Sequence, residues 1–443
     1  MTTPAASENK GKAMALLAAF LGWMFDGLEI GMFPMAGRPA LRELMSADIL
    51  ASGGSVDEVI GRWMGWITAA FLVGAAGGGI LFGWLGDRIG RVKAMVWSVL
   101  FYSVFSGLCC FVQAPWQLFT LRFLASLGMG GEWALGVSLV SEIWPAKSRP
   151  LLSGLIGAAA NVGFLMVGFI APGVSKFVGG LGSALSFLPD AWTTALLRND
   201  GWRVLFLVGS VPALLTFFIR IFVPESEKWK AAAGSGPKPK VSDIFAPDIR
   251  RYTILGALLA GVALMGTWGS VQFIPPWVRG FTGSQPKTAW VQIFAALGAI
   301  TFTIVVALLA QKFNRRKAYL GLCLGSLLIC QAIFLPHLNK VPQYGFVFLL
   351  LVTLANGISA GFYGWLPLYL PELFPTRIRA TGSGFCFNIG RVFAAVGALG
   401  SGELLRAFGG NYALMGSVIS VIYLAGIAVI WFCPETKGKP LPE

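Results

Sequence analysis

The 443-residue chain is 56% hydrophobic and only 12% charged, about half the charged share of a soluble domain. A soluble fold could not cover that much apolar surface, so the composition excludes a soluble enzyme and indicates a protein with a bilayer as its solvent. The net charge is +14, but the basic residues fall in short loops between apolar runs. A membrane-topology signal explains this charge, and we expect no nucleic-acid partner.

Twelve apolar runs are long enough to cross a bilayer, which takes about 20 residues. A polar, Gly/Pro/Lys-rich stretch divides them six and six. The predicted fold is therefore all-α, with twelve transmembrane helices in two pseudo-symmetric bundles at 1–224 and 251–443, joined by a cytoplasmic linker at 225–250. The predicted spans are 13–36, 61–84, 94–113, 116–140, 150–173, 202–223, 252–276, 289–311, 318–337, 344–370, 380–402 and 410–432.

Most Lys and Arg residues gather before the first span, in alternate loops, in the linker and after the last span. Positive charge marks cytoplasmic segments. We therefore expect a multi-pass protein of a bacterial inner membrane, with both termini in the cytoplasm. The six Cys show neither disulfide nor zinc spacing, so we expect no metal site. We also expect no cofactor and a monomeric transporter.

Three predicted cytoplasmic helix ends of the first half have counterparts, in the same order, in the second half. Such internal duplication is typical of secondary transporters, whose substrate site lies between the repeats. No P-loop is visible, so a gradient would drive any uphill transport. The paired segments are 83–93 with 307–317, 141–154 with 371–384, and 223–230 with 433–440.

The segment GWLGDRIGRVK at 83–93, between the second and third predicted spans, resembles the signature loop of the major facilitator superfamily. Flanking motifs resemble the sugar-porter and organic-acid:proton symporter branches, and the resemblance covers nearly the whole chain. The seventh span lacks the paired glutamines of sugar porters, and the fifth lacks the Gly-Pro motif of drug:proton antiporters. The flanking motifs are Pro145–Arg149, Pro224–Ser226, Pro434–Gly438, Gly130–Trp133 and Phe25–Gly27.

The resemblance implies a gate made of charged residues at the cytoplasmic helix ends. In the superfamily such residues form ion pairs within and between the halves, and these pairs hold the outward-facing state. The positions that match here are Asp87, Arg88, Arg91, Glu142, Arg149, Glu225, Glu372, Arg379 and Glu435.

Charged residues inside predicted spans are informative because burying each one costs on the order of 3 kcal/mol. Glu29 in span one and Arg122 in span four share a depth, at about 1.5 Å per residue, so they can pair. Asp26 lies three residues from Glu29, and two carboxylates so close repel, which favours a proton on one of them. Both acids are therefore proton-coupling candidates. Alternatively, Glu29–Arg122 is only a structural ion pair and Asp26 only a hydrogen-bond acceptor.

Glu132 lies deeper in span four, as a second proton site or as a polar tie to a neighbouring span. Arg391 in span eleven is always charged, so it needs either an anionic substrate or a protein carboxylate such as Asp26 or Glu132. A carboxylate substrate would suit its bidentate geometry. The predicted substrate-binding residues are Arg122, Arg391, Asn161 (the counterpart of Arg391 in the first half), Gln272, Tyr363, Trp365 and Asn388.

These patterns predict proton-coupled symport of a small organic anion, a mono- or aromatic carboxylate, by alternating access. The expected partners are this small molecule, protons and the lipid bilayer. An alternative is a proton-coupled or facilitative transporter of a neutral sugar or polyol, which the terminal motifs favour. A transporter-shaped receptor is disfavoured because the arms outside the spans are short.

Overall fold

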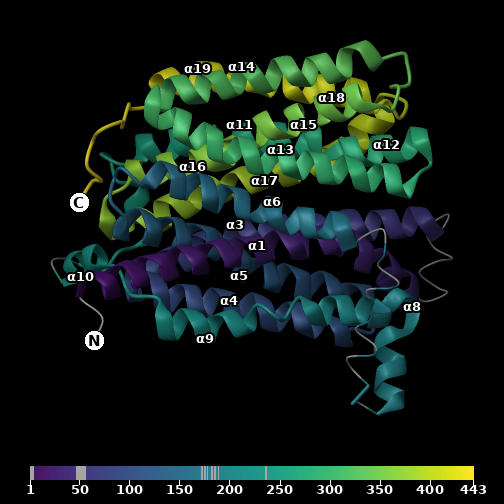
Figure 1. The fold of residues 1–443 in the computed structure, drawn as a ribbon, viewed down its shortest axis with the longest axis horizontal. Coiled ribbons are helices and arrows are strands. Elements are labelled where there is room, and N and C mark those ends of the chain that lie inside the picture. Colours follow the sequence, from purple (N-terminus) through teal and green to yellow (C-terminus); the bar gives the residue numbers. More distant parts are fainter. Residues whose placement is uncertain are drawn as a thin grey trace.

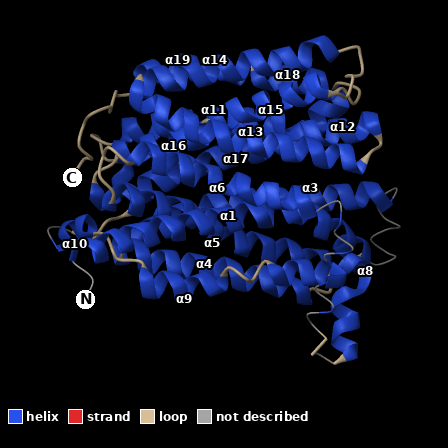
Figure 2. Cartoon of the chain, in the orientation of Figure 1, coloured by secondary structure: helices blue, strands red, loops and turns tan. Residues whose placement is uncertain are grey.

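The structure is a computed structural model that describes residues 4–45, 56–170, 173, 176, 178–180, 183, 186–187, 189–234 and 237–443. These residues form helices joined by loops, and they contain no strand (Figure 2). The structure confirms the predicted all-α fold of twelve transmembrane helices in two six-helix bundles.

The first bundle is built from the helices that precede the linker. Its helices are α1 (Pro4–Leu44), α3 (Val56–Ile89), α4 (Arg91–Leu108) with the 3-10 turn η1 (Cys109–Phe111), α5 (Pro115–Ile143), α6 (Arg149–Ile170), α8 (Asp190–Val208) and α9 (Ala213–Phe222). The linker holds α10 (Glu227–Gly234) and the 3-10 turn η3 (Val241–Phe245).

The second bundle repeats this plan with more interruptions. Its elements are α11 (Arg250–Gly269), η4 (Val271–Phe273), α12 (Ile274–Thr282), α13 (Gln285–Lys312), α14 (Arg315–Phe334), η5 (Leu335–His337), α15 (Phe346–Ala360), α16 (Phe362–Tyr369), η6 (Leu370–Leu373), η7 (Thr376–Ile378), α17 (Arg379–Ala407), α18 (Tyr412–Ser420), α19 (Ile422–Val429) and η8 (Ile430–Phe432).

In the described part of the chain, ten helical segments are long and apolar enough to cross a bilayer. The other two predicted spans fall on α8–α9, which a turn at 209–212 interrupts, and on α17, which is 29 residues long but carries Asn388 and Arg391. Proline disrupts a helix interior, so Pro275–Pro276 and Pro367 are expected to break spans seven and ten, but only one of the two observed breaks lies at a proline. Span seven changes to a 3-10 turn just before Pro275, whereas Pro367 lies inside α16 and the break in span ten falls at Gly361.

The two bundles lie one above the other in Figure 1, with α1–α9 below and α11–α19 above. The start of α1, the helix α10 and the C-terminal residues all lie at the left, which we call the linker end; the right is the far end. The bundles meet where α3 packs on α17 and α6 packs on α13. A Cβ atom on Gly384 of α17 would lie 2.5 Å from the carbonyl oxygen of Gly79 on α3, so only glycine permits this contact.

Candidate functional site

Three charged side chains from three helices meet in the middle of the molecule, between the bundles. Asp26 of α1 and Glu132 of α5 are buried, and their carboxyl groups lie within hydrogen-bonding reach of one another. Neither carboxyl group has another hydrogen-bond partner. Two ionised carboxylates at such a short distance repel one another, whereas a protonated carboxyl group can donate a hydrogen bond to its neighbour. Glu29 acts on Asp26 as a like charge, as expected from their spacing, but Glu132 acts on it more strongly.

Arg391 of α17 faces this acidic pair from the second bundle. Its guanidinium lies over the ring of Phe387, with 5.3 Å between the guanidinium carbon and the ring centroid. Asp26 is the acidic residue whose charge acts on Arg391. Nevertheless, no described carboxylate lies within ion-pair distance of Arg391, and its buried Nη1 has no hydrogen-bond partner. The alternative that a protein carboxylate neutralises Arg391 directly is therefore wrong for this conformation.

Aromatic rings from both bundles surround these charges. Trp133 of α5 stacks on Phe387 of α17, with ring centroids 3.8 Å apart and planes 12° apart. Trp23 of α1 makes edge contacts with Trp133, Phe387 and Tyr363, at centroid distances of 6.1–6.3 Å. The hydroxyl of Tyr363 accepts a 3.0 Å hydrogen bond from Trp268. The cluster thus offers flat apolar walls beside one cation.

A second charged site lies within the first bundle, toward the far end. Arg122 of α5 donates to Glu29 of α1 at 2.5 Å, so the pairing expected from their shared depth is present. Ser106 of α4 also donates to Glu29. The rings of Phe33 and Phe71 each lie 4.7 Å from the Arg122 guanidinium carbon. Arg122 was expected to bind substrate, but here a protein carboxylate and two rings occupy its guanidinium.

The remaining predicted cavity residues divide into two groups. Asn388 is buried and donates to the carbonyl of Gly130 at 3.2 Å, which ties α17 to α5. Asn161 is half-buried and Gln272 is exposed, and the structure gives neither a hydrogen-bond partner among the described residues, so both remain available to a ligand.

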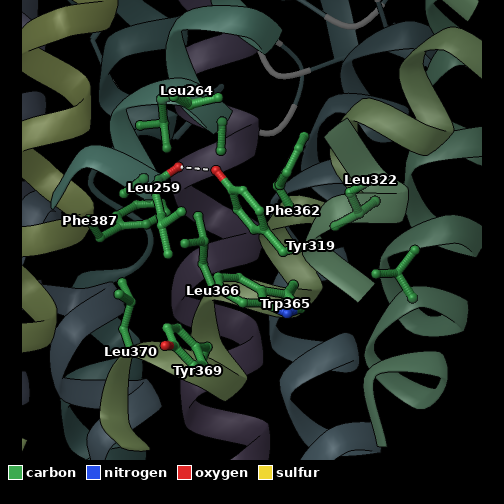
Figure 3. Packing of buried hydrophobic residues seen from close by; sticks show 14 of the residues in the cluster. Leu259, Leu264, Tyr319, Leu322, Phe362, Trp365, Leu366, Tyr369, Leu370 and Phe387 are labelled. Carbon is green, nitrogen blue, oxygen red and sulfur yellow. Dashed lines mark hydrogen bonds between the residues drawn. The ribbon is translucent and has the colours of Figure 1, made fainter. Parts of the chain in front are cut away.

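Trp365 does not belong to the central site. It lies inside the second bundle, beside Tyr319 and Tyr369 (Figure 3). Its indole N–H donates to the carbonyl oxygen of Arg315 at 2.9 Å. The prediction that Trp365 lines the substrate cavity is therefore wrong, because its polar atom and both ring faces serve packing at the linker end.

A network of buried ion pairs joins the bundles at the linker end. Asp87 accepts hydrogen bonds from the backbone N–H groups of Ala380 and Thr381, at 3.1 and 2.8 Å, and so caps the start of α17. A carboxylate at a helix N-terminus is favourable because it satisfies unpaired N–H groups. Arg91 contacts Asp87 and donates to Glu142 at 2.9 Å. Glu142 also binds Arg379 of the second bundle at 3.0 Å.

The duplication predicted from the sequence reappears in this network. Glu225 accepts hydrogen bonds from the N–H groups of Arg91 and Val92 at the start of α4. Glu435 does the same for Arg315 and Arg316 at the start of α14. Arg315 pairs with Glu372 at 2.8 Å, as Arg91 pairs with Glu142. Each bundle therefore carries the same arrangement, in which a glutamate accepts hydrogen bonds from the N–H groups at a helix start and the first arginine of that helix pairs with a second glutamate. We call this arrangement the clamp, and Glu225 and Glu435 the clamp glutamates.

The two clamp glutamates differ in acidity. Burial raises the pKa of Glu225 above its usual range, despite hydrogen bonds from the N–H groups of Ser226, Val92 and Arg91. Burial acts in the same direction on Glu435, but N–H donors at Lys437, Arg315 and Arg316 hold its pKa below the usual range. As the pH falls, Glu225 therefore takes up a proton before Glu435 does.

Comparison with known proteins decides the family. The family model of the Major Facilitator Superfamily matches residues 15–398. The chain belongs to the Major Facilitator Superfamily. It is a transporter and not an enzyme, and it resides in a membrane through multiple spans.

Curated relatives match the transporter over nearly its full length. The "Probable 4-methylmuconolactone transporter" of Cupriavidus pinatubonensis is 30% identical over 427 residues, covering 95% of this chain and 90% of its own. The cis,cis-muconate transport protein of Acinetobacter baylyi is 28% identical over 440 residues, covering 96% and 95%. The solved proton:xylose symporter XylE has a TM-score of 0.74 and 19% identity over 98% of each chain, which shows a shared fold.

Two residues that the superfamily resemblance assigned to the gate make no ion pair with any residue that the structure describes. Arg88 is exposed and lies over the ring of Trp84 at 5.1 Å. Arg149 has a buried Nε without a hydrogen-bond partner. Glu372 is the acid whose charge acts on Arg149, but Glu372 is paired with Arg315. Both assignments are wrong for this conformation. The sequence reasoning missed Arg315, although it aligns with Arg91 at the offset of the duplicated loop.

The gate of the transporter should open at the linker end when Glu142 is replaced by glutamine. Glu142 is the shared acceptor of Arg91 and Arg379, and leaving buried charges without their partner costs about 3–5 kcal/mol. The Glu142→Gln substitution removes this stabilisation from the state that is closed at the linker end. A cysteine reporter at Ser383, which is fully buried on α17, should then react at least about tenfold faster with a polar maleimide added at the linker end.

Two features keep this labelling measurement interpretable. The six native cysteines are all buried, so background labelling is low. Glu403→Gln is the matched control because it removes an exposed ion pair with Arg406 on α17, the helix that carries the Ser383→Cys reporter. An unchanged Ser383→Cys labelling rate in Glu142→Gln would show that Glu142 does not hold the linker end closed.

Proposed function

We propose that the transporter carries a small organic anion, a mono- or aromatic carboxylate, into the cell together with protons, by alternating access. The observation that carries this proposal is the buried guanidinium of Arg391, which has an unpartnered N–H group and lies near the carboxyl groups of Asp26 and Glu132. A buried cation without a partner is unfavourable, so the site favours an anionic ligand. A neutral sugar would leave this charge unpaired.

The aromatic walls support the same substrate class. Trp133 and Phe387 stack across the interface between the bundles, beside Arg391. A planar acid could place its carboxylate on Arg391 and its apolar body against these rings. Two relatives are named as transporters of 4-methylmuconolactone and of cis,cis-muconate, which are small unsaturated metabolites. These names favour an organic acid over a sugar or polyol.

Proton coupling would come from the acids of the first bundle. When the proton leaves the Asp26–Glu132 pair, the two carboxylates lose their hydrogen bond and repel one another. The freed charge would then compete with the substrate for Arg391 and promote release. Glu29, in its ion pair with Arg122, is the second proton-coupling candidate. In this scheme the substrate and the protein carboxylates occupy Arg391 in turn.

Orientation in the membrane follows from charge. We place the linker end in the cytoplasm, with both termini, because the linker and the chain ends that lie there are rich in Lys and Arg. The ion pairs that join the bundles at this end then hold an outward-facing state. We retain 1–224, 225–250 and 251–443 as the proposed bundle and linker boundaries, and an inner-membrane monomer as the working unit.

The first test is a measurement of external pH around lightly buffered proteoliposomes when solutes are added. Protein-dependent alkalinisation with carboxylates such as benzoate and cis,cis-muconate, and none with xylose or glucose, is the expected result. Protein-free liposomes control for passive entry of the uncharged acid. Alkalinisation with sugars alone would overturn the substrate class, and radiolabelled carboxylate uptake without any pH change would overturn proton coupling.

A further inference from the structure

The segment 436–442, which we call the tail strap, folds back over the linker end of the second bundle. The backbone N–H of Lys439 donates to the carbonyl of Thr436 at 3.1 Å and closes a turn. Gly438 lies in this turn with a φ of +77°, a conformation that glycine adopts without steric cost. Beyond the turn, the side chain of Leu441 is buried. The proposed function does not use this segment.

Both ends of the tail strap are fixed to the second bundle. At its start, the hydroxyl of Thr436 donates to Glu372 at 2.6 Å. At its end, the carbonyl oxygen of Pro442 accepts a 2.6 Å hydrogen bond from Arg379 and a 3.5 Å hydrogen bond from the hydroxyl of Thr376. A guanidinium donates in fixed directions, so the carbonyl oxygen of Pro442 restrains the orientation of Arg379.

Arg379 links the tail strap to the first bundle. It is fully buried, and each of its three nitrogens has an acceptor. Nη1 donates to Glu142 of the first bundle at 3.0 Å. Nε donates to the carbonyl of Pro371 at 3.3 Å, and Nη2 donates to the carbonyl of Pro442. When the bundles separate, Glu142 is therefore the acceptor that is lost, while the two acceptors that orient the guanidinium remain in the second bundle.

The backbone just before Arg379 makes a second link between the bundles. The carbonyl oxygen of Thr376 accepts a hydrogen bond from Arg91 of the first bundle at 2.8 Å. The hydroxyl of the same Thr376 contacts Pro442. Both residues that receive the end of the tail strap, Thr376 and Arg379, thus also hold the first bundle. The tail strap ends at the point where the two bundles are joined.

We propose that the tail strap positions Arg379 for its ion pair with Glu142 and so determines how firmly the linker end is held closed. A guanidinium that is already oriented loses less conformational freedom when it binds a carboxylate. Without the tail strap, Nη2 of Arg379 would be buried without an acceptor in the closed state, which is unfavourable. The inference goes beyond the transport function, because it depends neither on the substrate class nor on proton coupling.

The decisive variant is deletion of 441–443, which removes the buried anchor and the Pro442 acceptor. The labelling rate of Ser383→Cys with a polar maleimide at the linker end should rise about fivefold, as expected when one buried hydrogen bond of the closed state is lost. Gly438→Ala should raise the same rate by about twofold or more, because its Cβ atom meets open space but the left-handed turn becomes unfavourable. This second variant leaves every residue of the anchor in the chain.

Gly283→Ala is the matched control for the turn. Gly283 follows α12, also has a positive φ, and also has open space at its Cβ position, so its substitution should leave the labelling rate unchanged. Positioning is tested by combining the deletion with Glu142→Gln. If the tail strap acts through the Arg379–Glu142 pair, the deletion should add less than about twofold to the labelling rate of Glu142→Gln.

Two results would overturn the inference. One is an unchanged labelling rate in both the deletion and Gly438→Ala. The other is a full fivefold increase when the deletion is added to Glu142→Gln, because the tail strap would then only cover Ser383. Labelling requires no substrate and no pH gradient, so a failure of the proposed transport function would leave this test unaffected.

Discussion

Replacing Arg391 with glutamine should reduce the affinity for a carboxylate substrate at least about a hundredfold, because truncating one partner of a buried, hydrogen-bonded charge pair costs about 2–5 kcal/mol. Glutamine keeps a hydrogen-bond donor of similar reach but carries no charge. Arg391→Lys should recover part of the affinity, since it restores the charge without the bidentate geometry. Quenching of the tryptophan fluorescence of Trp23 and Trp133, which lie in the same cluster, can report binding.

The control for Arg391 is Arg406→Gln on the same helix. Arg406 forms an exposed ion pair with Glu403, and such pairs contribute about 1 kcal/mol or less. The affinity of the Arg406→Gln transporter for a carboxylate should therefore match that of the wild type. Carboxylate binding that survives Arg391→Gln undiminished would remove Arg391 from the substrate site. A gain of sugar binding in that variant would favour the alternative substrate class.

Asp26→Asn should abolish accumulation driven by a pH gradient, while exchange of substrate across the membrane continues. Asn has nearly the same shape but cannot take up or release a proton, so the pair with Glu132 loses its titratable partner. The amide can still donate a hydrogen bond to Glu132, which mimics the protonated pair. We expect gradient-driven uptake to fall about a hundredfold, in line with the loss of a proton-transfer group.

This measurement separates coupling from folding. Asp190→Asn, at the exposed start of α8, changes the same chemical group far from the central site and should leave uptake unchanged. Glu132→Gln should reproduce the Asp26→Asn result, because either substitution removes the shared proton. Full gradient-driven uptake by Asp26→Asn would exclude Asp26 from coupling and leave Glu29 as the remaining candidate.

The sequence identified the charged residues of the site and the Glu29–Arg122 pair, but not the pairing of Asp26 with Glu132. Ionisable side chains inside apolar runs are rare, so Asp26, Glu29, Glu132 and Arg391 stand out without any structure. Partner choice depends on helix rotation and on small neighbours. Asp26 and Glu29 are close along α1 yet lie beside different residues of α5, Glu132 and Arg122, and Gly22 leaves the room that the Glu132 carboxyl group fills.

The linker end shows the same division between what sequence can and cannot reveal. The duplicated motifs predicted which helix ends carry charge, and the offset between them would also have identified Arg315. They did not predict that Arg149 is left without an ion pair while its counterpart Arg379 has one. The two acids are used differently: both carboxylate oxygens of Glu372 accept from Arg315, whereas one oxygen of Glu142 accepts from both Arg91 and Arg379.

All three acids of the central region come from the first bundle, whereas Arg391 and Phe387 come from the second. In the proposed mechanism, the proton-carrying groups therefore come from the first half of the chain, and the cation that would hold the substrate comes from the second half. Mutations in α11, α16 and α17 can retune selectivity while the ion-driven machinery stays intact. Laboratory evolution toward a new acid should therefore concentrate its substitutions after residue 250, and hybrids that exchange only the second half should inherit the cargo of the donor with the driving force of the host.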